Sequence, residues 1–175
     1  NLTPGAAPHQ TIQSAVNAAS NGNAILIHKG IYQGTGNKDI DTLGKKIIIT
    51  SKEGAELTII DCEYSGRGFY IHSGENKDTV ISNLSIENGY VTGLSGYGGA
   101  ICCYLASITV ESCVFYNCRS EREGGAIFID RSNGHFLIKN SLFYQNFAEI
   151  EGGAIYLTNN DDDHLFLDSC RLSYN

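Results

Sequence analysis

Short apolar runs separated by polar breaks recur through the second half of the chain at a nearly constant spacing. Gly-Gly-Ala-Ile opens three copies, at Gly98, Gly124 and Gly152, and these copies begin 26 and 28 residues apart, as the numbering shows. Each copy contains three apolar runs of strand length and no stretch with helical periodicity. A repeat of this kind indicates a coil that stacks on itself and buries a continuous core. We therefore expect an all-β chain, a single-stranded parallel β-helix.

Aligning the copies predicts which side chains point inward, because side chains alternate along a strand. The predicted inward columns are Phe69, Ile101, Ile127 and Ile155; Ile71, Cys103, Ile129 and Leu157; Val110, Ile138 and Leu167; and Phe115, Phe143 and Leu172. Two corner columns are also expected, namely Asn83, Ser112, Asn140 and Ser169, and then Gly89, Cys118, Asn146 and Asn175. Stacked asparagines at such corners hydrogen-bond to one another and to the turn backbone.

The first part of the chain predicts a cap followed by looser rungs. Residues 11–20 have an apolar face at helical spacing, with Thr11 as N-cap and Asn21-Gly22 as the end. Strands are expected at 24–27, 46–50, 57–61, 68–71 and 79–88, with a corner at 30–34. We predict a cap segment at 1–23, whose helix covers the open end of the coil, and about six rungs in 24–175. We expect the coil to continue in a longer parent chain.

Several of these motifs resemble known families. Gly-Gly-Ala-Ile paired with Phe-x-x-Asn resembles the repeats of the chlamydial polymorphic membrane proteins and related bacterial surface β-helix proteins. The opening Thr-Ile-Gln-Ser-Ala-Val-Asn-Ala-Ala, with Gly-Ile-Tyr-Gln-Gly and Thr-Ile-Ile-Asp after it, resembles the start of right-handed parallel β-helices of the pectin-lyase-like superfamily. The resemblance covers nearly the whole chain and departs from the motif at Gly89, Cys118 and Leu172. It implies a right-handed coil and a surface-exposed passenger or adhesin domain.

Charge and hydropathy exclude some classes of partner. The net charge is −7 and no basic run is longer than Lys45-Lys46, which disfavours nucleic-acid binding. No apolar stretch approaches the roughly 20 residues of a membrane span, so we expect no membrane insertion of this segment. We expect an extracellular or cell-surface location.

The cysteines do not form an obvious disulfide framework, although there are six of them. Cys113 and Cys170 occupy one column two rungs apart, which places them roughly 9.6 Å apart, beyond the reach of a bridge. Cys103 lies in an inward column, whereas Cys102 and Cys118 are expected to be more accessible. We expect most of the cysteines to be unbridged, while a bridge at Cys62 or Cys102 stays open.

Candidate catalytic and metal-binding residues are few. The enzymes of the superfamily implied by the resemblance need carboxylates clustered on one sheet face. Asp130 is the candidate, but its column neighbours are His72, Tyr104 and Thr158, so no second carboxylate joins it. Asp161, Asp162 and Asp163 are candidate ligands of a calcium ion, although a solvated acidic turn is the favoured interpretation and no cofactor is expected.

Outward aromatic side chains are the stronger functional signal. On the first strand, Gly68, Ala100, Ala126 and Ala154 are expected beside Tyr70, Cys102, Phe128 and Tyr156, forming a flat apolar strip. The candidate binding residues are Tyr70, Tyr104, Phe128, Tyr156, Tyr116 and Tyr144. Such strips stack on sugar rings or are buried by protein partners, unless a loop of the same chain covers them.

The favoured function is a non-catalytic module for adhesion or assembly, which binds glycan or protein along its sheet faces or associates with itself by end-to-end stacking. The alternatives are a polysaccharide lyase or glycoside hydrolase, and an architectural spacer.

Overall fold

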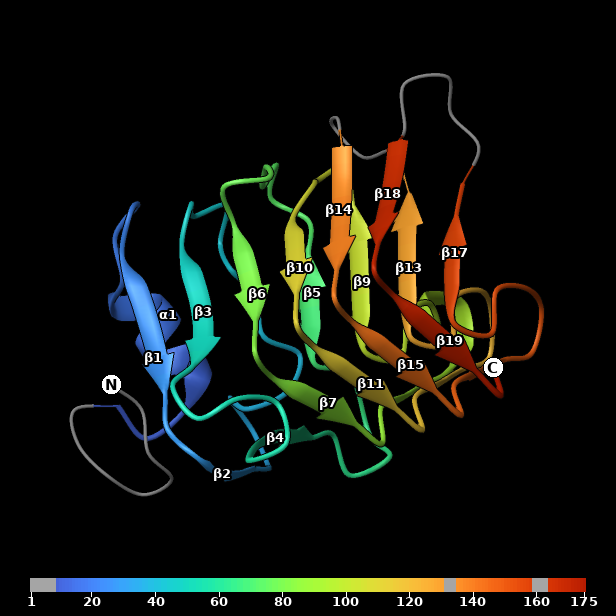
Figure 1. Cartoon of the computed structure of the whole chain (residues 1–175), viewed down its shortest axis with the longest axis horizontal. Coiled ribbons are helices and arrows are strands. Elements are labelled where there is room, and N and C mark those ends of the chain that lie inside the picture. Colours follow the sequence, from blue (N-terminus) through green and yellow to red (C-terminus); the bar gives the residue numbers. More distant parts are fainter. Residues whose placement is uncertain (1–8, 131–134, 159–163) are drawn as a thin grey trace.

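The computed structural model describes residues 9–130, 135–158 and 164–175 and shows a parallel β-solenoid (Figure 1). Two sheets have six strands each, in the orders β1-β3-β6-β10-β14-β18 and β2-β4-β7-β11-β15-β19. This agrees with the prediction of about six rungs. The first sheet comprises β1 (Ala24–Ile27), β3 (Ile48–Ser51), β6 (Val80–Ser82), β10 (Thr109–Glu111), β14 (His135–Lys139) and β18 (His164–Asp168). The second comprises β2 (Gly30–Tyr32), β4 (Thr58–Asp61), β7 (Ser85–Glu87), β11 (Val114–Tyr116), β15 (Leu142–Tyr144) and β19 (Arg171–Ser173).

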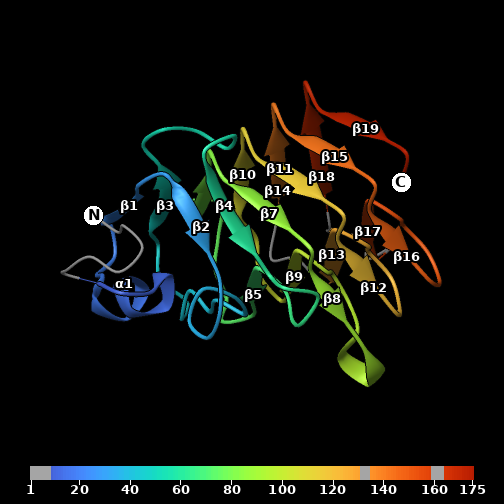
Figure 2. The same ribbon diagram turned by 90° about the horizontal axis from the view of Figure 1, so that it is seen from below.

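Two smaller sheets complete the coil (Figure 2). One contains β5 (Phe69–Ile71), β9 (Ile101–Tyr104), β13 (Ile127–Asp130) and β17 (Ile155–Leu157), and the other β8 (Tyr90–Val91), β12 (Arg119–Ser120) and β16 (Phe147–Ala148). The sheet of β8, β12 and β16 was not predicted, because its strands are only two residues long and show no alternation. The residues predicted as a corner at 30–34 include strand β2.

The predicted inward columns form the core up to the last rung, where Leu167 and Leu172 are each 47 % exposed because no further rung of the structure covers them. Phe69, Ile101 and Ile127 are in direct register on successive rungs and are fully buried. The rings of Phe115 and Phe143 stack with centroids 4.7 Å apart. Because equivalent residues sit above one another, each rung extends the same aliphatic and aromatic stacks, and each buried large side chain contributes about 1.5–3 kcal/mol of hydrophobic stabilisation.

The alanine column is the main error of the sequence prediction. Ala100 and Ala126 are fully buried and belong to the core, as does Ala154, so they do not form an outward strip. The backbone bends at Gly98 and Gly124, where φ is +62° and +72°. After this bend the alanine and the isoleucine that follows it both face the interior, so the outward strip is a single column.

The first predicted corner column forms as expected. Its members are all in the left-handed region, with φ of 55°, 53°, 48° and 55° at Asn83, Ser112, Asn140 and Ser169. The short polar side chains of asparagine and serine tolerate this conformation and hydrogen-bond locally. The side chain of Asn83 donates to Thr50 Oγ1 at 3.2 Å.

The second corner differs from the prediction by one residue. The left-handed positions are Asn88, Asn117, Gln145 and Tyr174, each one residue before the predicted column. Asn146 instead points inward, where its Oδ1 accepts from the backbone N–H of Cys118 at 3.0 Å. Its Nδ2 donates to Phe115 O at 3.0 Å and to Asn175 Oδ1 at 2.8 Å. The asparagine ladder therefore forms inside the corner, where it satisfies buried backbone groups.

The helix α1 (Ile12–Ala18) lies at one end of the coil beside β1 (Figure 1). Thr11 caps it as predicted, because its Oγ1 accepts from the Ser14 N–H at 3.1 Å. Ile12, Ala15 and Val16 are buried against the core. The helix has its C-cap at Ala19, two residues before the predicted end at Asn21.

All six cysteines are free. The expectation that Cys102 and Cys118 are more accessible is wrong, because both are buried. Cys118 lies in the inward-facing ladder with Asn146, and Cys102 lies in the floor of the groove described below, where it is only 5 % exposed.

Candidate functional site

A groove of about 370 Å³ runs over the sheet of β5, β9 and β13. Its lining residues are Arg67, Tyr70, Leu94, Ser95, Tyr97, Cys102, Tyr104, Phe128 and Asp130. One wall is the sheet, and the other is the loop after β8, residues 92–97, which contains the 3₁₀ helix Gly93–Ser95 and projects from the coil (Figure 2). Three predicted binding residues, Tyr70, Tyr104 and Phe128, together with Asp130, are therefore brought together.

The register of the strands positions the floor of the groove. Tyr70 pairs with Cys102, Cys102 pairs with Phe128, and Phe128 pairs with Tyr156 on the next rung. Because side chains alternate along a strand, these four residues share the outward face. The rings of Phe128 and Tyr156 are stacked, with centroids 5.8 Å apart.

The loop 92–97 covers the middle of this aromatic column. The ring of Tyr97, a residue of the loop, packs on Phe128 with ring centroids 4.5 Å apart. The Arg122 guanidinium in turn lies 4.9 Å from the centroid of the Tyr97 ring. As a result Phe128 is only 6 % exposed, whereas Tyr70 is 39 % exposed. The alternative that a loop of the same chain covers the strip thus holds for Phe128 and does not hold for Tyr70.

Hydrogen bonds tie the loop down at both ends. The Gly93 N–H donates to Glu121 Oε2 at 2.7 Å, and the Arg122 N–H donates to Gly96 O at 3.0 Å. Arg67 Nη2 donates to Ser95 O at 2.9 Å across the groove. The groove is therefore preformed, since its second wall is attached to the strands beneath.

The groove carries opposite charges at two places. The Arg67 side chain is nearly buried, lies 3.8 Å from Asp39 Oδ1 and stands 5.2 Å from the Tyr70 ring. The carboxylate of Asp130 accepts from Thr158 Oγ1 at 2.6 Å. Cys102 also lines the groove, and burial raises the pKa of its thiol to about 11. The positive charge of Arg67 lowers this pKa, while the negative charge of Asp130 raises it. The thiol is therefore not an activated nucleophile.

Two of the three neighbours that the alignment predicted for Asp130, Tyr104 and Thr158, are confirmed. Asp130 pairs with Tyr104, and its hydrogen-bond partner Thr158 comes from the next rung. No second carboxylate lines the groove among the residues that the structure describes. His72 lies 3.3 Å from Asp41 and stacks on Tyr70 with ring centroids 4.2 Å apart.

A second outward column lies on the sheet that contains β4, β7, β11 and β15. Asp61, Glu87, Tyr116 and Tyr144 are in direct register on four successive rungs. Burial raises the pKa of Glu87, and the neighbouring Asp61 raises it further. Burial would also raise the pKa of Asp61, but hydrogen bonds from Asn88, the Glu63 N–H and Gln33 lower it overall. The pKa of Glu87 is therefore raised and that of Asp61 lowered, so Asp61 loses its proton at a lower pH than Glu87.

The sequence prediction missed this carboxylate pair. The repeat alignment covers the regular copies that contain Tyr116 and Tyr144, whereas the irregular spacing of the earlier rungs hides the two residues that continue the same column. Asp61 ends Thr-Ile-Ile-Asp and Glu87 follows Ser-Ile, so both occupy the position of Tyr116. The signal for the pair is therefore the continuation of the Tyr116 column into the two preceding rungs.

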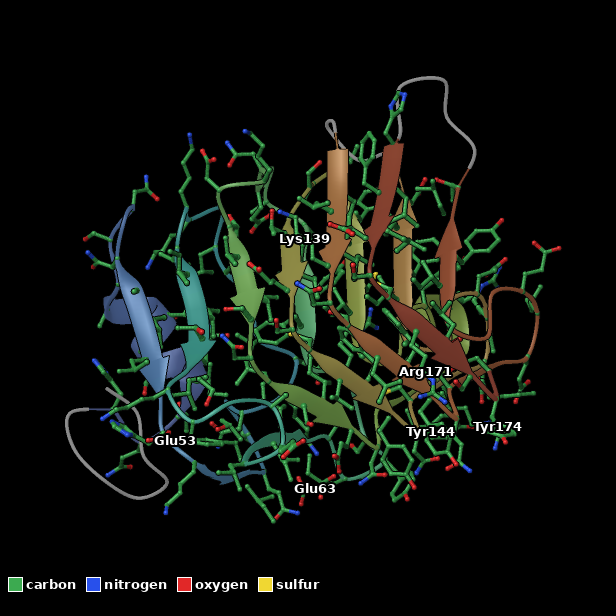
Figure 3. The ribbon with its side chains drawn as sticks, in the orientation of Figure 1. Glu53, Glu63, Lys139, Tyr144, Arg171 and Tyr174 are labelled. Atoms are coloured by element: carbon green, nitrogen blue, oxygen red, sulfur yellow. The ribbon has the colours of Figure 1, made fainter. Side chains whose placement is uncertain are left out.

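The tyrosines of this column stack on one another and do not form a flat platform. The rings of Tyr116 and Tyr144 lie 5.8 Å apart at 14°, and Tyr174 meets Tyr144 edge-on at 5.5 Å. Tyr144 and Tyr174 lie near one another beside β15 and β19 (Figure 3). Each ring therefore uses part of its face on its neighbour.

The candidate calcium ligands Asp161, Asp162 and Asp163 lie outside the described residues. Within the described ranges, no three His, Cys, Asp or Glu side chains are grouped so as to hold a metal ion. No helix in that part of the chain is long and apolar enough to span a membrane.

Comparison with known proteins agrees with this architecture. A family model described as right handed beta helix region matches residues 11–172. The chain belongs to this family. No curated protein and no solved structure matches the chain. The family assignment gives the hand of the coil, while the resemblance to chlamydial surface repeats stays a prediction.

Proposed function

We propose that the chain is a non-catalytic, extracellular or cell-surface β-helix module that binds glycan in the groove beside loop 92–97. The observation that carries this proposal is the groove itself, a preformed hollow of 370 Å³ with aromatic walls and a few converging polar groups. The resemblance of the repeats to bacterial surface β-helix proteins supports the location.

The lining suits a saccharide because it combines two kinds of contact. Tyr70, Leu94 and Tyr97 offer apolar surface to the C–H faces of a sugar ring. The carboxylate of Asp130 offers acceptor positions to sugar hydroxyl groups. A ligand with alternating apolar and hydroxyl surfaces fits both.

A glycan array followed by calorimetric titration tests the proposal. Tyr70→Ala removes an exposed groove side chain and should weaken the binding of a selected glycan about tenfold or more, in line with the burial of one aromatic side chain. Ile48→Ala is the matched control. The Ile48 side chain is 40 % exposed, close to the 39 % of Tyr70, but it lies in β3 on another sheet. Equal affinities for the two variants, or no glycan retained by the wild-type chain, would refute groove binding.

A polysaccharide-active enzyme is the second candidate, and the Asp61–Glu87 pair favours it. Paired carboxyl groups whose pKa values are pushed apart provide an acid and a base for glycosidic cleavage. The raised pKa of Glu87 suits it to the acid role and the lowered pKa of Asp61 to the charged role.

Release of reducing ends from a panel of polysaccharides measures this activity. Glu87→Gln should abolish it, whereas Glu111→Gln, on the neighbouring sheet, should not. If no polysaccharide is cleaved, or if both variants cleave equally, the pair has no such role.

Self-association by end-to-end stacking is the remaining part of the proposal. The last described rung presents an apolar hollow lined by Leu157, Leu165, Leu167, Leu172 and other residues. End-to-end stacking of two copies through this rung would bury the hollow. Light scattering of the wild-type chain and of Leu172→Lys tests this, with a concentration-dependent dimer expected only for the wild-type chain.

A further inference from the structure

The two charged groups of the groove differ in how well the chain itself neutralises them. The guanidinium of Arg67 has the Ser95 carbonyl at 2.9 Å, the Asp39 carboxylate at 3.8 Å and the Tyr70 ring at 5.2 Å. Only about 10 % of its side chain is exposed. A ligand therefore gains little from Arg67, because contacts within the chain already use it.

Asp130 is in the opposite situation. Its carboxylate accepts one side-chain hydrogen bond, from Thr158 Oγ1, and no cation of the described residues lies within ion-pair distance. An ionised carboxylate has about four acceptor positions, so most of this capacity faces the groove unused. Asp130 is half-buried beside Tyr104, where water compensates its charge less well than on an open surface.

The other basic groups near the groove are already paired with carboxylates of the chain. His72, beside the groove, is already paired with Asp41 at 3.3 Å, and Arg122 lies 3.7 Å from Glu123 and packs on Tyr97. The chain as a whole carries −7. Among the described residues, the charge of the groove that has no opposite partner is therefore the carboxylate of Asp130, and a positive group on a ligand would pair with it.

We infer that the groove selects saccharides that carry a free, protonated amino group, with the ammonium placed against the Asp130 carboxylate. This inference rests on the proposed glycan-binding function and specifies its ligand class. An ammonium donates charge-assisted hydrogen bonds to the carboxylate, which are roughly twice as strong as those of a neutral hydroxyl. Masking the amine as an acetamide removes the charge and leaves a ligand that only the apolar walls and neutral contacts hold.

The test compares two forms of one oligosaccharide on the unmodified chain. A chitosan tetramer and its fully N-acetylated counterpart are titrated by calorimetry at a mildly acidic pH that protonates the sugar amines. The wild-type chain should bind the free amine about tenfold more tightly, as expected for one hydrogen-bonded charge. This preference should shrink as salt is added.

Asp130→Asn removes the charge while keeping an oxygen that accepts from Thr158, and should abolish the preference. Asp168→Asn is the matched control, because Asp168 is exposed on the neighbouring sheet and the change in net charge is the same. Circular dichroism melts of both variants check that the coil is intact.

Each outcome is decisive. If both saccharides bind equally to the wild-type chain, or if Asp168→Asn lowers the preference as much as Asp130→Asn, the amine inference is overturned while glycan binding stands. If neither saccharide nor any glycan of the array binds, the proposed function fails and the inference fails with it.

Discussion

The substitution Gly125→Ala isolates what the Gly-Gly-Ala-Ile motif requires. A Cβ atom at Gly125 would overlap the carbonyl oxygen of Gly153 and lie 2.6 Å from the backbone C and N of Phe147. These atoms are backbone, so they cannot move aside without displacing a rung. The Gly125 N–H also donates to Gly152 O at 2.9 Å, so displacement would strain the ladder that joins the rungs.

The expected magnitude follows from two opposing effects. Gly125 is not among the glycines with a positive φ, so alanine is allowed there and would by itself stabilise the fold by about 0.4–1 kcal/mol. Overpacking against fixed backbone costs about 1–3 kcal/mol or more. With overlap this severe the steric effect dominates, and we expect a net loss of about 2 kcal/mol or more in the free energy of unfolding.

Urea denaturation followed by far-ultraviolet circular dichroism measures this loss, with two comparison variants. Gly153 occupies the same position of the motif, but a Cβ atom there would lie 2.8 Å from one backbone atom of Asn175 and at least 3.5 Å from its next neighbours. Gly153→Ala should therefore lower the free energy of unfolding clearly less than Gly125→Ala. Gly74→Ala meets nothing within 4 Å but has φ of +76°, so it should cost about 1 kcal/mol through backbone strain alone. A neutral or stabilising Gly125→Ala, or equal losses at Gly125 and Gly153, would refute the steric explanation.

Two further predictions follow from the titratable groups. The pKa of Glu87 is higher in the folded chain than in the unfolded chain, so as the pH rises the unfolded chain loses the Glu87 proton at a lower pH. The contribution of Glu87 to the free energy of unfolding is therefore fully present at low pH and is lost as the pH rises through the folded-state pKa. Glu87→Gln should therefore stabilise the fold at neutral pH by about 0.2–1 kcal/mol, the range for directly opposed like charges, and the gain should vanish in acid; a gain that persists in acid would contradict this. Iodoacetamide at mildly alkaline pH should label Cys170, which is partly exposed, before the five buried cysteines. Burial raises the pKa of Cys102 to about 11 and that of Cys118 to about 12, and rapid labelling of either thiol, detected by peptide mass spectrometry, would show that the rungs open.

The inward columns were predictable because a stacked repeat places equivalent residues in identical surroundings. Phe115 and Phe143 are both buried and stacked as the alignment required. The alternation rule failed at Ala100 and Ala126, where the bend at the preceding glycines turns two consecutive residues inward. A period of two holds only while the backbone stays extended, so a corner resets it.

The candidate site was predictable only in part, for a different reason. Tyr70, Phe128 and Asp130 could be assigned to the outward face of one sheet from the repeat alone. That Tyr97 covers Phe128, and that Arg67 and Ser95 close the groove, depends on a loop 92–97 that has no counterpart in the aligned repeat. The carboxylate pair of Asp61 and Glu87 lay within reach of the alignment, but the irregular spacing of the early rungs hid it.

The coil follows from the local sequence, because repeated local signals produce a repeated local structure. Glycines set the bends, small polar residues the corners, and alternating apolar residues the core, and each signal acts over a few residues. The tertiary structure alone decided where the loop 92–97 docks, which charges are neutralised within the chain and which acceptor positions stay open at Asp130. These features depend on contacts between residues 28 positions apart in the chain, and such contacts exist only once the rungs have stacked.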